Sequence, residues 1–426
     1  MNSKLGNLFK GDKVVWMIFF ILCLVSIIEV FSASSFLTFG SGSYWGPLIK
    51  HTGTIVLGLG AMLFMLNIPC KYFKIVTFPL LLVSVVMLLC VLAFGESTNG
   101  ASRWMGFMGI QFQPSEIAKG ALVLAVAQIL SAMQTEHGAD RQAFWWVLGT
   151  SSVVILPIFL ENFSTAALLS LVVFLMMFVG QVPFSQLGRL LAAGIIVVGL
   201  AVGAVLTLGE DTSKLNEVEK EKMELTEVSA NADEEAQATK RKGLLHRMDT
   251  WKSRMMKFFD EEVKPEEYDL DKDAQVAHAN IAIIKSNVIG RGPGNSEERD
   301  FLSQAFSDFI FAIIIEETGL AGAAFVAILY VILFWRAGRI ARSCANTFPA
   351  YLAMGIGLLL VIQALFNMMV AVGLAPVTGQ PLPLVSKGGT STIINCVYIG
   401  MLLSISKSAK KKEQVQPILS NVSHEV

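Results

Sequence analysis

Long apolar runs constrain this chain more than any other feature of its sequence. An α-helix needs about 17–25 apolar residues to cross the hydrocarbon core of a bilayer. Only 16% of the residues are charged, whereas soluble domains contain about 25%. We therefore predict an all-α integral membrane protein with about ten transmembrane helices in one bundle. The runs that are long enough are 14–36, 50–69, 73–95, 115–133, 144–161, 163–181, 187–209, 307–335, 349–373 and 390–408.

Positive charge is distributed unevenly among the segments that connect these runs. Cytoplasmic loops of membrane proteins carry an excess of Lys and Arg. We therefore predict that both termini are cytoplasmic and that segments 96–114, 210–306 and 374–390 lie outside. No small-residue cleavage site follows the first run, so we expect a retained helix rather than a signal peptide. The basic residues on the cytoplasmic side are Lys71, Lys74, Arg141, Arg189, Arg336, Arg339, Arg342, Lys407, Lys410, Lys411 and Lys412.

This orientation divides the chain into three parts. Residues 1–209 carry helices one to seven, and residues 307–426 carry helices eight to ten and a cytoplasmic tail. Residues 210–306 form a large extracytoplasmic loop between them. Within it, residues 210–242 mix acidic and basic side chains with almost no aromatic ones, which favours a solvated helix or disorder. Residues 244–259 are amphipathic at helical spacing, which is typical of a helix on the membrane surface or of one packed on the rest of the loop.

Cysteine spacing and net charge argue against several other classes of protein. The five cysteines show no metal-ligand spacing, so the sequence predicts neither a disulfide framework nor a zinc site. The formal net charge is −1 and no basic stripe is present, so we expect no nucleic-acid partner.

Asp308 is the strongest candidate for a catalytic residue. It lies where a polar, glycine-containing stretch meets an apolar run, and a carboxylate there is costly unless it is paired, wetted or used. We expect it in the first turn of the eighth helix, where the helix dipole stabilises the anion while apolar surroundings favour the neutral acid. These opposed effects suit a general base, although a simple N-cap is the alternative. Glu316 and Glu317 are too far along the helix to pair with Asp308, and we expect at least one to support the fold from within the bundle.

A second irregular stretch, 373–391, interrupts the apolar pattern near the end of the chain. Its prolines and glycines are too dense for a regular helix, and irregular backbone at membrane depth must be buried in protein or line a wet cavity. We expect it to meet the Asp308 region at one membrane face. Residues 388–391 open the tenth helix, where free N–H groups and Lys387 could hold a phosphate. The alternative is a re-entrant loop that only plugs the bundle.

Two pairs of polar residues flank the start of the fourth helix. Arg103 and Trp104 lie in an outer loop, where the arginine could bind phosphate or could simply extend to the interface beside an aromatic belt. Pro114 favours a helix start. Glu116 and Lys119 follow on one face of that helix, where they could line a cavity or form a pair that neutralises itself.

Five sequence motifs occur together and in order. They resemble the SEDS family of shape, elongation, division and sporulation proteins over nearly the whole chain. PLPLVS followed by GGTS is more similar to the cell-division members than to the elongation members. Lys387 stands where an aromatic residue is common in the family. The motifs are NGASRW (99–104), QPSEIAK (113–119), GPGNS (292–296), SDFIFAIIIEETG (307–319) and GLAPVTGQPLPLVSKGGTS (373–391).

The resemblance implies a glycosyltransferase that polymerises lipid II, an undecaprenyl-pyrophosphate-linked disaccharide peptide, outside the bacterial plasma membrane. It also implies septal cell-wall synthesis together with a class B penicillin-binding protein and other division proteins. Asp308 matches the family's essential extracytoplasmic aspartate. We add Trp104 and Lys387 to the candidate substrate-binding residues. The remaining candidates, which match polar positions of the family, are Arg103, Glu116, Lys119, Gln275, Ser386, Gly388, Gly389 and Ser391.

In such a reaction the acceptor is the 4-hydroxyl of the GlcNAc of another lipid II, and a pyrophosphate leaves the donor's anomeric carbon. Asp308 would remove the hydroxyl proton, while Arg103 and Lys119 would stabilise the developing charge. A divalent cation such as Mg²⁺ or Mn²⁺ would assist, although the sequence shows no dedicated cage for one.

Two other classes of function are also compatible with the sequence. A lipid II transporter (flippase) would use a polar path through Glu29, Glu116, Lys119 and Glu316. A non-catalytic divisome scaffold would leave Asp308 as a helix cap that tolerates asparagine.

Overall fold

The computed structural model describes residues 10–39, 45–94, 96–98, 101–107, 110–136, 138–208, 274–301, 307–377 and 379–422. The charged stretch 210–242 and the amphipathic stretch 244–259 lie outside the described residues, so the predictions for them stay predictions. Within the described part, long helices dominate, which confirms the all-α class.

Each predicted apolar run contains one helix. By length and hydropathy, eight of the described helices could cross a membrane, while α7 and the apolar part of α8 are shorter. The count of ten transmembrane helices therefore stays a prediction. The helices are α2 (Lys13–Phe39), α3 (Gly46–Asn67), α4 (Lys71–Phe94), α5 (Pro114–Ala132), α6 (Arg141–Glu161), α7 (Phe163–Val179), α8 (Phe184–Leu208), α13 (Ile310–Ser343), α14 (Thr347–Ala371) and α15 (Thr390–Val422).

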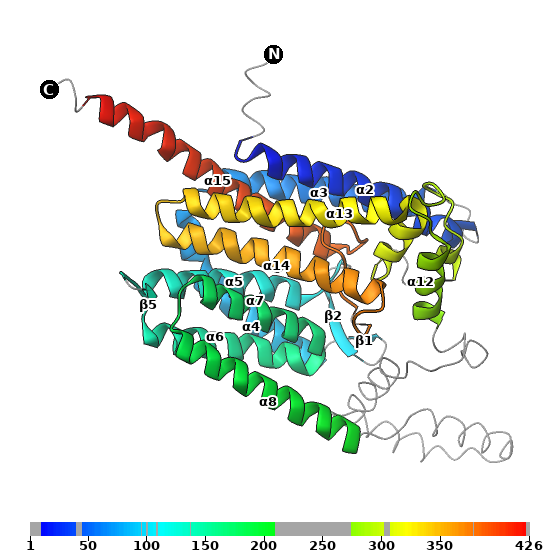
Figure 1. Ribbon diagram of the computed structural model, residues 1–426, viewed down its shortest axis with the longest axis horizontal. Helices are drawn as coiled ribbons and strands as arrows, with labels where there is room; N and C mark the ends of the chain where they lie inside the picture. The colour runs from blue at the N-terminus through cyan, green and yellow to red at the C-terminus, as the bar shows by residue number, and fades with distance from the viewer. Residues whose placement is uncertain are drawn as a thin grey trace. The chain divides into compact units, whose positions relative to one another are not determined.

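The helices of the main unit differ in how much of their surface they bury. In α14, 78% of the membrane-length window is buried, and in α5 it is 72%, whereas in α3 and α4 it is only 22%. A helix that is apolar on all sides is typical of a buried position, and α14 packs against α13, α5 and α7. Figure 1 shows α13 and α14 side by side. The polar residues of α5 and α14 are therefore held in the interior.

A second unit comprises residues 185–272 and 375–377. Helix α8 has 25 residues, and all of them except Phe184 belong to this unit. The polar residues discussed below all belong to the main unit.

Short strands precede α5, and the sequence did not predict them. They are β1 (Glu96–Thr98), β2 (Ala101–Phe107) and β3 (Ile110–Phe112), in an antiparallel sheet of order β1-β2-β3. Thr98 pairs with Ala101, so only Asn99 and Gly100 separate the first two strands, and Asn-Gly is the preferred sequence of two-residue hairpins. A second small sheet pairs β4 (Gln134–Thr135) with β5 (Gly138–Ala139).

Helix α13 is broken at Gly319, where φ is 70° and ψ is −175°. The break separates a buried segment, 310–318, from a longer segment, 320–343. The loop before the helix satisfies the backbone there: Gly292 N donates to Glu317 O over 2.8 Å, and Ala321 N donates to Val288 O over 3.2 Å. A break at membrane depth is stable only when such partners exist. The predicted run 307–335 therefore contains a helix that begins at Ile310 and is broken at Gly319, and the sequence did not predict the break.

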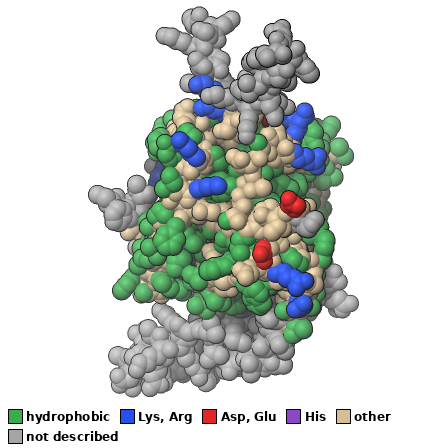
Figure 2. Space-filling view, turned by 90° about the vertical axis from the view of Figure 1, so that its left-hand side faces the viewer, with side chains coloured by type: hydrophobic (Ala, Val, Ile, Leu, Met, Phe, Trp, Pro, Cys, Tyr) green, Lys and Arg blue, Asp and Glu red, His purple; other side chains and the backbone are tan. Residues whose placement is uncertain are grey.

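Basic side chains gather at the end of the main unit where α2 begins. Arg336 near the end of α13 forms an ion pair with Asp12 just before α2, and the ammonium of Lys74 lies 5.1 Å from the ring centroid of Phe348. In Figure 2, Lys and Arg side chains outnumber Asp and Glu side chains on the face shown. This distribution agrees with the charge asymmetry on which the predicted orientation depends.

Candidate functional site

Asp308 lies in a turn just before α13. The helix begins at Ile310 and its N-cap is Phe309, which makes no side-chain cap bond. Asp308 is therefore neither in the first helical turn nor an N-cap, so both placements predicted from the sequence are wrong. Its side chain is partly exposed, and the hydroxyl of Ser307 donates to its Oδ1 over 3.0 Å. The carboxylate thus remains partly accessible at the end of a buried half-helix.

Asn367 on α14 joins the two irregular stretches. Its side-chain amide donates to the main-chain oxygen of Asp308 over 2.8 Å and to that of Gln380 over 2.7 Å. Gln380 in turn donates to the hydroxyl of Thr165 on α7 over 2.5 Å. The prediction that the stretch before α13 and the stretch before α15 meet is therefore confirmed.

Ser386 makes a second connection between the same two stretches. Its hydroxyl donates to the main-chain oxygen of Ser307 over 2.6 Å and accepts from the N–H of Leu382 over 2.8 Å. The turn between these residues contains Leu384 at φ 67°, a conformation that a non-glycine residue adopts only when its surroundings enforce it. The residue next to Asp308 is thus fixed by a strained turn.

Glu116 and Lys119 form a sealed pair inside the bundle. The Lys119 ammonium is 0% exposed and lies 2.8 Å from Glu116 Oε1 and 2.8 Å from Gln363 Oε1. Ser391, in the first turn of α15, is 3.4 Å from the other Glu116 oxygen. The alternative of a pair that neutralises itself therefore describes this structure, and Lys119 does not reach the surface to contact a substrate in this conformation.

Replacing Lys119 by methionine is expected to destabilise the protein by about 3–5 kcal/mol, because it leaves the Glu116 carboxylate buried without its cation. The matched control is the double variant Glu116→Gln with Lys119→Met, which removes both charges and should recover most of the loss. Thermal unfolding of the purified variants in detergent measures both. A Lys119→Met protein as stable as wild type would show that Glu116 is not sealed from water.

Glu316 and Glu317 support the fold from within the bundle, as predicted. Both are 0% exposed. Glu316 accepts from the Ser296 hydroxyl over 2.5 Å and from the N–H of Glu297 over 3.0 Å. Glu317 accepts from the N–H of Gly294 over 3.0 Å and from the hydroxyl of Ser32 on α2. The two carboxylates thus hold the GPGNS loop against the broken part of α13, and neither is bonded to Asp308.

An ionic cluster ties α12 (Ala274–Lys285) to the short 3-10 helix η1 (Glu298–Asp300). Glu298 lies 2.6 Å from His278 and 2.7 Å from Lys285. Burial alone would raise the pKa of Glu298, but the hydrogen bonds from Lys285 and His278 outweigh burial and lower it. The ring of Phe301 stacks on His278 with centroids 4.9 Å apart. This cluster fixes α12 against η1.

The structure brings together only some of the residues that the sequence singled out. Two of them bond to α14: Asp308 accepts from Asn367, and Lys119 donates to Gln363. Glu116 bonds to Lys119 and Ser391, and Ser386 bonds to Ser307 beside Asp308. The backbones of Arg103 and Trp104 lie on β2 and that of Gln275 on α12, while their side chains are outside the described part of the chain.

The loop before α15 is partly open to the surroundings. Lys387 and Gly388 are partly exposed, and Gly389 is exposed with φ 53°. Burial and the charge of the nearby Lys50 both lower the pKa of Lys387. The helix α15 begins at Thr390, as predicted. Among the described residues, no group of three or more His, Cys, Asp or Glu side chains is placed to hold a metal ion.

Sequence reasoning missed Gln363 and Asn367, which connect the site. They lie four residues apart on α14 and are both 1% exposed. Residues at this spacing share a helix face, and polar residues in an apolar span usually face a polar interior. That spacing was the signal that could have identified them.

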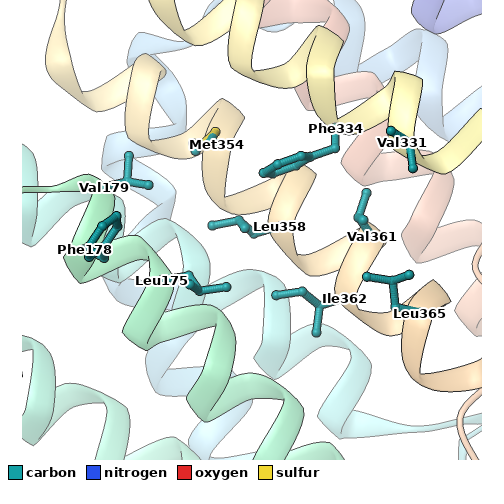
Figure 3. A pocket seen from close by; sticks show the side chains of 10 residues that line it. All are labelled: Leu175, Phe178, Val179, Val331, Phe334, Met354, Leu358, Val361, Ile362 and Leu365. Carbon is teal, nitrogen blue, oxygen red and sulfur yellow. The ribbon is translucent and has the colours of Figure 1, made fainter. Parts of the chain in front are cut away.

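An apolar groove of about 420 Å³ lies between α7, α13 and α14 (Figure 3). Every side chain that lines it is apolar, so it offers no group for acid–base chemistry. The lining residues are Leu175, Phe178, Val179, Val331, Phe334, Met354, Leu358, Val361, Ile362 and Leu365.

The fold and the site together define a polytopic α-helical membrane protein in which a carboxylate is held where a broken helix meets a strained turn. The chain matches the model of the cell cycle protein family that groups FtsW, RodA and SpoVE, over residues 12–219 and 239–411. It belongs to that family, which confirms the resemblance to SEDS proteins.

Known relatives match along most of their length. The chain is 30% identical to the "Probable peptidoglycan glycosyltransferase FtsW" of Halomonas elongata, over 92% of this chain and 90% of that protein. It is 26% identical to the peptidoglycan glycosyltransferase MrdB of Escherichia coli, over 94% of each chain.

Solved structures share the fold. One is a chain of a peptidoglycan synthase complex that coordinates polymerization and crosslinking, with a TM-score of 0.64 and 22% identity over 94% of this chain and 99% of that one. Another is the rod shape determining protein RodA of Thermus thermophilus, with a TM-score of 0.60 and 20% identity over 95% of this chain and 99% of that one.

Proposed function

We propose that this protein is a peptidoglycan glycosyltransferase that polymerises lipid II into glycan strands at the outer face of the plasma membrane, for septal synthesis during cell division. The observation that carries the proposal is that Asp308 is both fixed in position and partly exposed. Its main chain is fixed by Asn367 and its side chain is partly exposed, whereas the Glu116, Glu316 and Glu317 side chains are buried. Among these carboxylates, Asp308 is the one a substrate can reach.

The chemistry requires one proton transfer and one displacement. Asp308 accepts the proton of the acceptor's 4-hydroxyl as that oxygen forms a bond to the donor's anomeric carbon. The bond from that carbon to the pyrophosphate oxygen breaks, and undecaprenyl pyrophosphate leaves. Its negative charge needs donors fixed in advance. Arg103, Lys387 and the N-terminus of α15 are the proposed donors.

Lys119 has an indirect role in this proposal. Because it is bonded to Glu116 and Gln363, it fixes α14, whose Asn367 holds the main chain of Asp308. It acts by positioning, and the stabilisation of the leaving group is assigned to the donors named above.

The relatives' names support the proposed reaction class, and the solved synthase complex, which couples polymerization to crosslinking, supports a crosslinking partner. We propose lipid II as donor and acceptor, a class B penicillin-binding protein as the transpeptidase partner, and other division proteins as further partners. Both termini are proposed to be cytoplasmic, because the basic residues of the chain are concentrated in the segments on that side of the predicted spans.

Purified full-length protein in liposomes is expected to convert fluorescent lipid II into glycan strands, with a higher rate when its cognate transpeptidase is present. Gel separation of strand lengths measures this activity. The same liposomes, assayed for lipid II that changes leaflet, test a transporter. Leaflet exchange without strands would replace the glycosyltransferase proposal with transport, and neither activity would favour a scaffold.

A further inference from the structure

The strained turn that bonds to Ser307 is held by side chains from several helices. The hydroxyl of Tyr330 on α13 donates to the main-chain oxygen of Pro383. Gln363 on α14 donates to that of Pro381 over 3.1 Å. A buried carbonyl without a partner is costly, so each of these bonds favours this one conformation of the turn.

Ser26 on α2 bonds to the turn at the residue directly before Ser386. Its hydroxyl is 0% exposed and donates to the main-chain oxygen of Val385 over 2.6 Å. Val385 is the residue directly before Ser386, whose own hydroxyl donates to Ser307 O. A single buried serine is therefore linked to the residue beside Asp308 through two hydrogen bonds and the peptide link between Val385 and Ser386.

His51 on α3 completes this arrangement. It is 2% exposed, and its Nε2 lies 2.8 Å from the Ser26 hydroxyl oxygen. A serine hydroxyl has one hydrogen to donate, and that hydrogen is directed to Val385. His51 therefore carries a hydrogen on Nε2 and donates it to Ser26, which fixes the direction of the serine hydroxyl. The pair ties α2 and α3 to the turn.

We propose that Ser26 and His51 are positioning residues for glycan transfer: through Val385 and Ser386 they hold the turn that places Asp308. This inference rests on the proposed function. Neither residue touches substrate in this account. Catalytic geometry tolerates little displacement, since a shift of about 1 Å can lower a rate about 100-fold. Loss of the bond to Val385 would let the strained Leu384 relax and move Ser386 with Asp308.

The protein contains a matched control for this contact. Ser404 on α15 is 2% exposed, and its hydroxyl also donates over 2.6 Å to a main-chain oxygen of another segment, that of Ile68 between α3 and α4. Ser26→Ala and Ser404→Ala therefore delete the same kind of hydrogen bond. Ser26→Ala also deletes the bond from His51, so we expect it to lose somewhat more thermal stability than Ser404→Ala. Only Ser26→Ala should lower the rate at saturating lipid II, by about 10-fold, with KM unchanged.

Substitutions of His51 test whether its Nε2 donates the hydrogen bond to Ser26. Glutamine can place an N–H where His51 has Nε2, whereas leucine cannot. We expect His51→Gln to retain most of the rate and His51→Leu to lose about as much as Ser26→Ala. Equal losses in both histidine variants would overturn the assignment of a donor role.

Hydrogen exchange tests the same link without relying on activity. Mass spectrometry of the full-length variants in detergent should show faster exchange in residues 379–389 and around Ser307 for Ser26→Ala but not for Ser404→Ala. Equal exchange in the two variants would overturn the proposal. If the wild-type protein makes no glycan but Ser26→Ala alone still exchanges faster in these segments, the positional link stands and the proposed function is rejected instead.

Discussion

The Asp308→Asn variant is expected to lose glycan polymerisation by at least about 100-fold while folding normally. General base catalysis contributes roughly 10²–10⁴-fold to a rate, and asparagine cannot accept the proton of the sugar hydroxyl. The fold should tolerate the change because Asn367 binds the main-chain oxygen of Asp308, which the substitution retains. The measurement is the rate of strand formation from lipid II in liposomes, with the transpeptidase partner present.

Asp140→Asn is a suitable control for this experiment. Asp140 is the N-cap of α6, where its side chain accepts from the N–H of Gln142. It undergoes the same chemical change far along the chain from the site, and asparagine is an equally good cap. Its rate should match wild type. If Asp308→Asn also matched wild type, the carboxylate would not be the base, and the catalytic assignment would fail.

Replacing Gly319 by alanine is expected to destabilise the protein by roughly 3 kcal/mol. The backbone at Gly319 has φ 70° and ψ −175°, a region that is essentially restricted to glycine and costs other residues about 1–3 kcal/mol. A Cβ atom there would also lie 2.4 Å from Val288 O and 2.5 Å from Gly290 N. Backbone atoms cannot rotate away as a side chain can, so the overlap adds to the conformational cost. Thermal unfolding in detergent measures the loss.

Gly338 provides the matched substitution in the same helix. A Cβ added there meets nothing within 4 Å, so alanine should stabilise α13 by up to about 1 kcal/mol. The two variants thus make the same chemical change with opposite expected signs. A Gly319→Ala protein as stable as Gly338→Ala would show that α13 continues without a break. We also expect Gly319→Ala to lower polymerisation, because the break orients the half-helix that follows Asp308.

The positions of the helices could be predicted because a membrane span needs a minimum length of apolar sequence. The same reasoning could not find the break at Gly319. An isolated glycine within an apolar run is compatible with a regular helix. This one departs from helical geometry where Gly290 packs against it: a Cβ atom at Gly290 would lie 2.4 Å from Gly319 N.

The sequence by itself determined the class of fold, the family and the identity of the candidate base, because apolar length, charge asymmetry and ordered motifs are local properties of the chain. Only the tertiary structure decided how the polar residues are used. The i, i+3 spacing of Glu116 and Lys119 predicted that they share a face, but Gln363 from α14 closes that face. Asn367 and Ser386 fix the surroundings of Asp308 from far along the chain. Such contacts depend on which helices pack together, and packing is a property of the whole bundle.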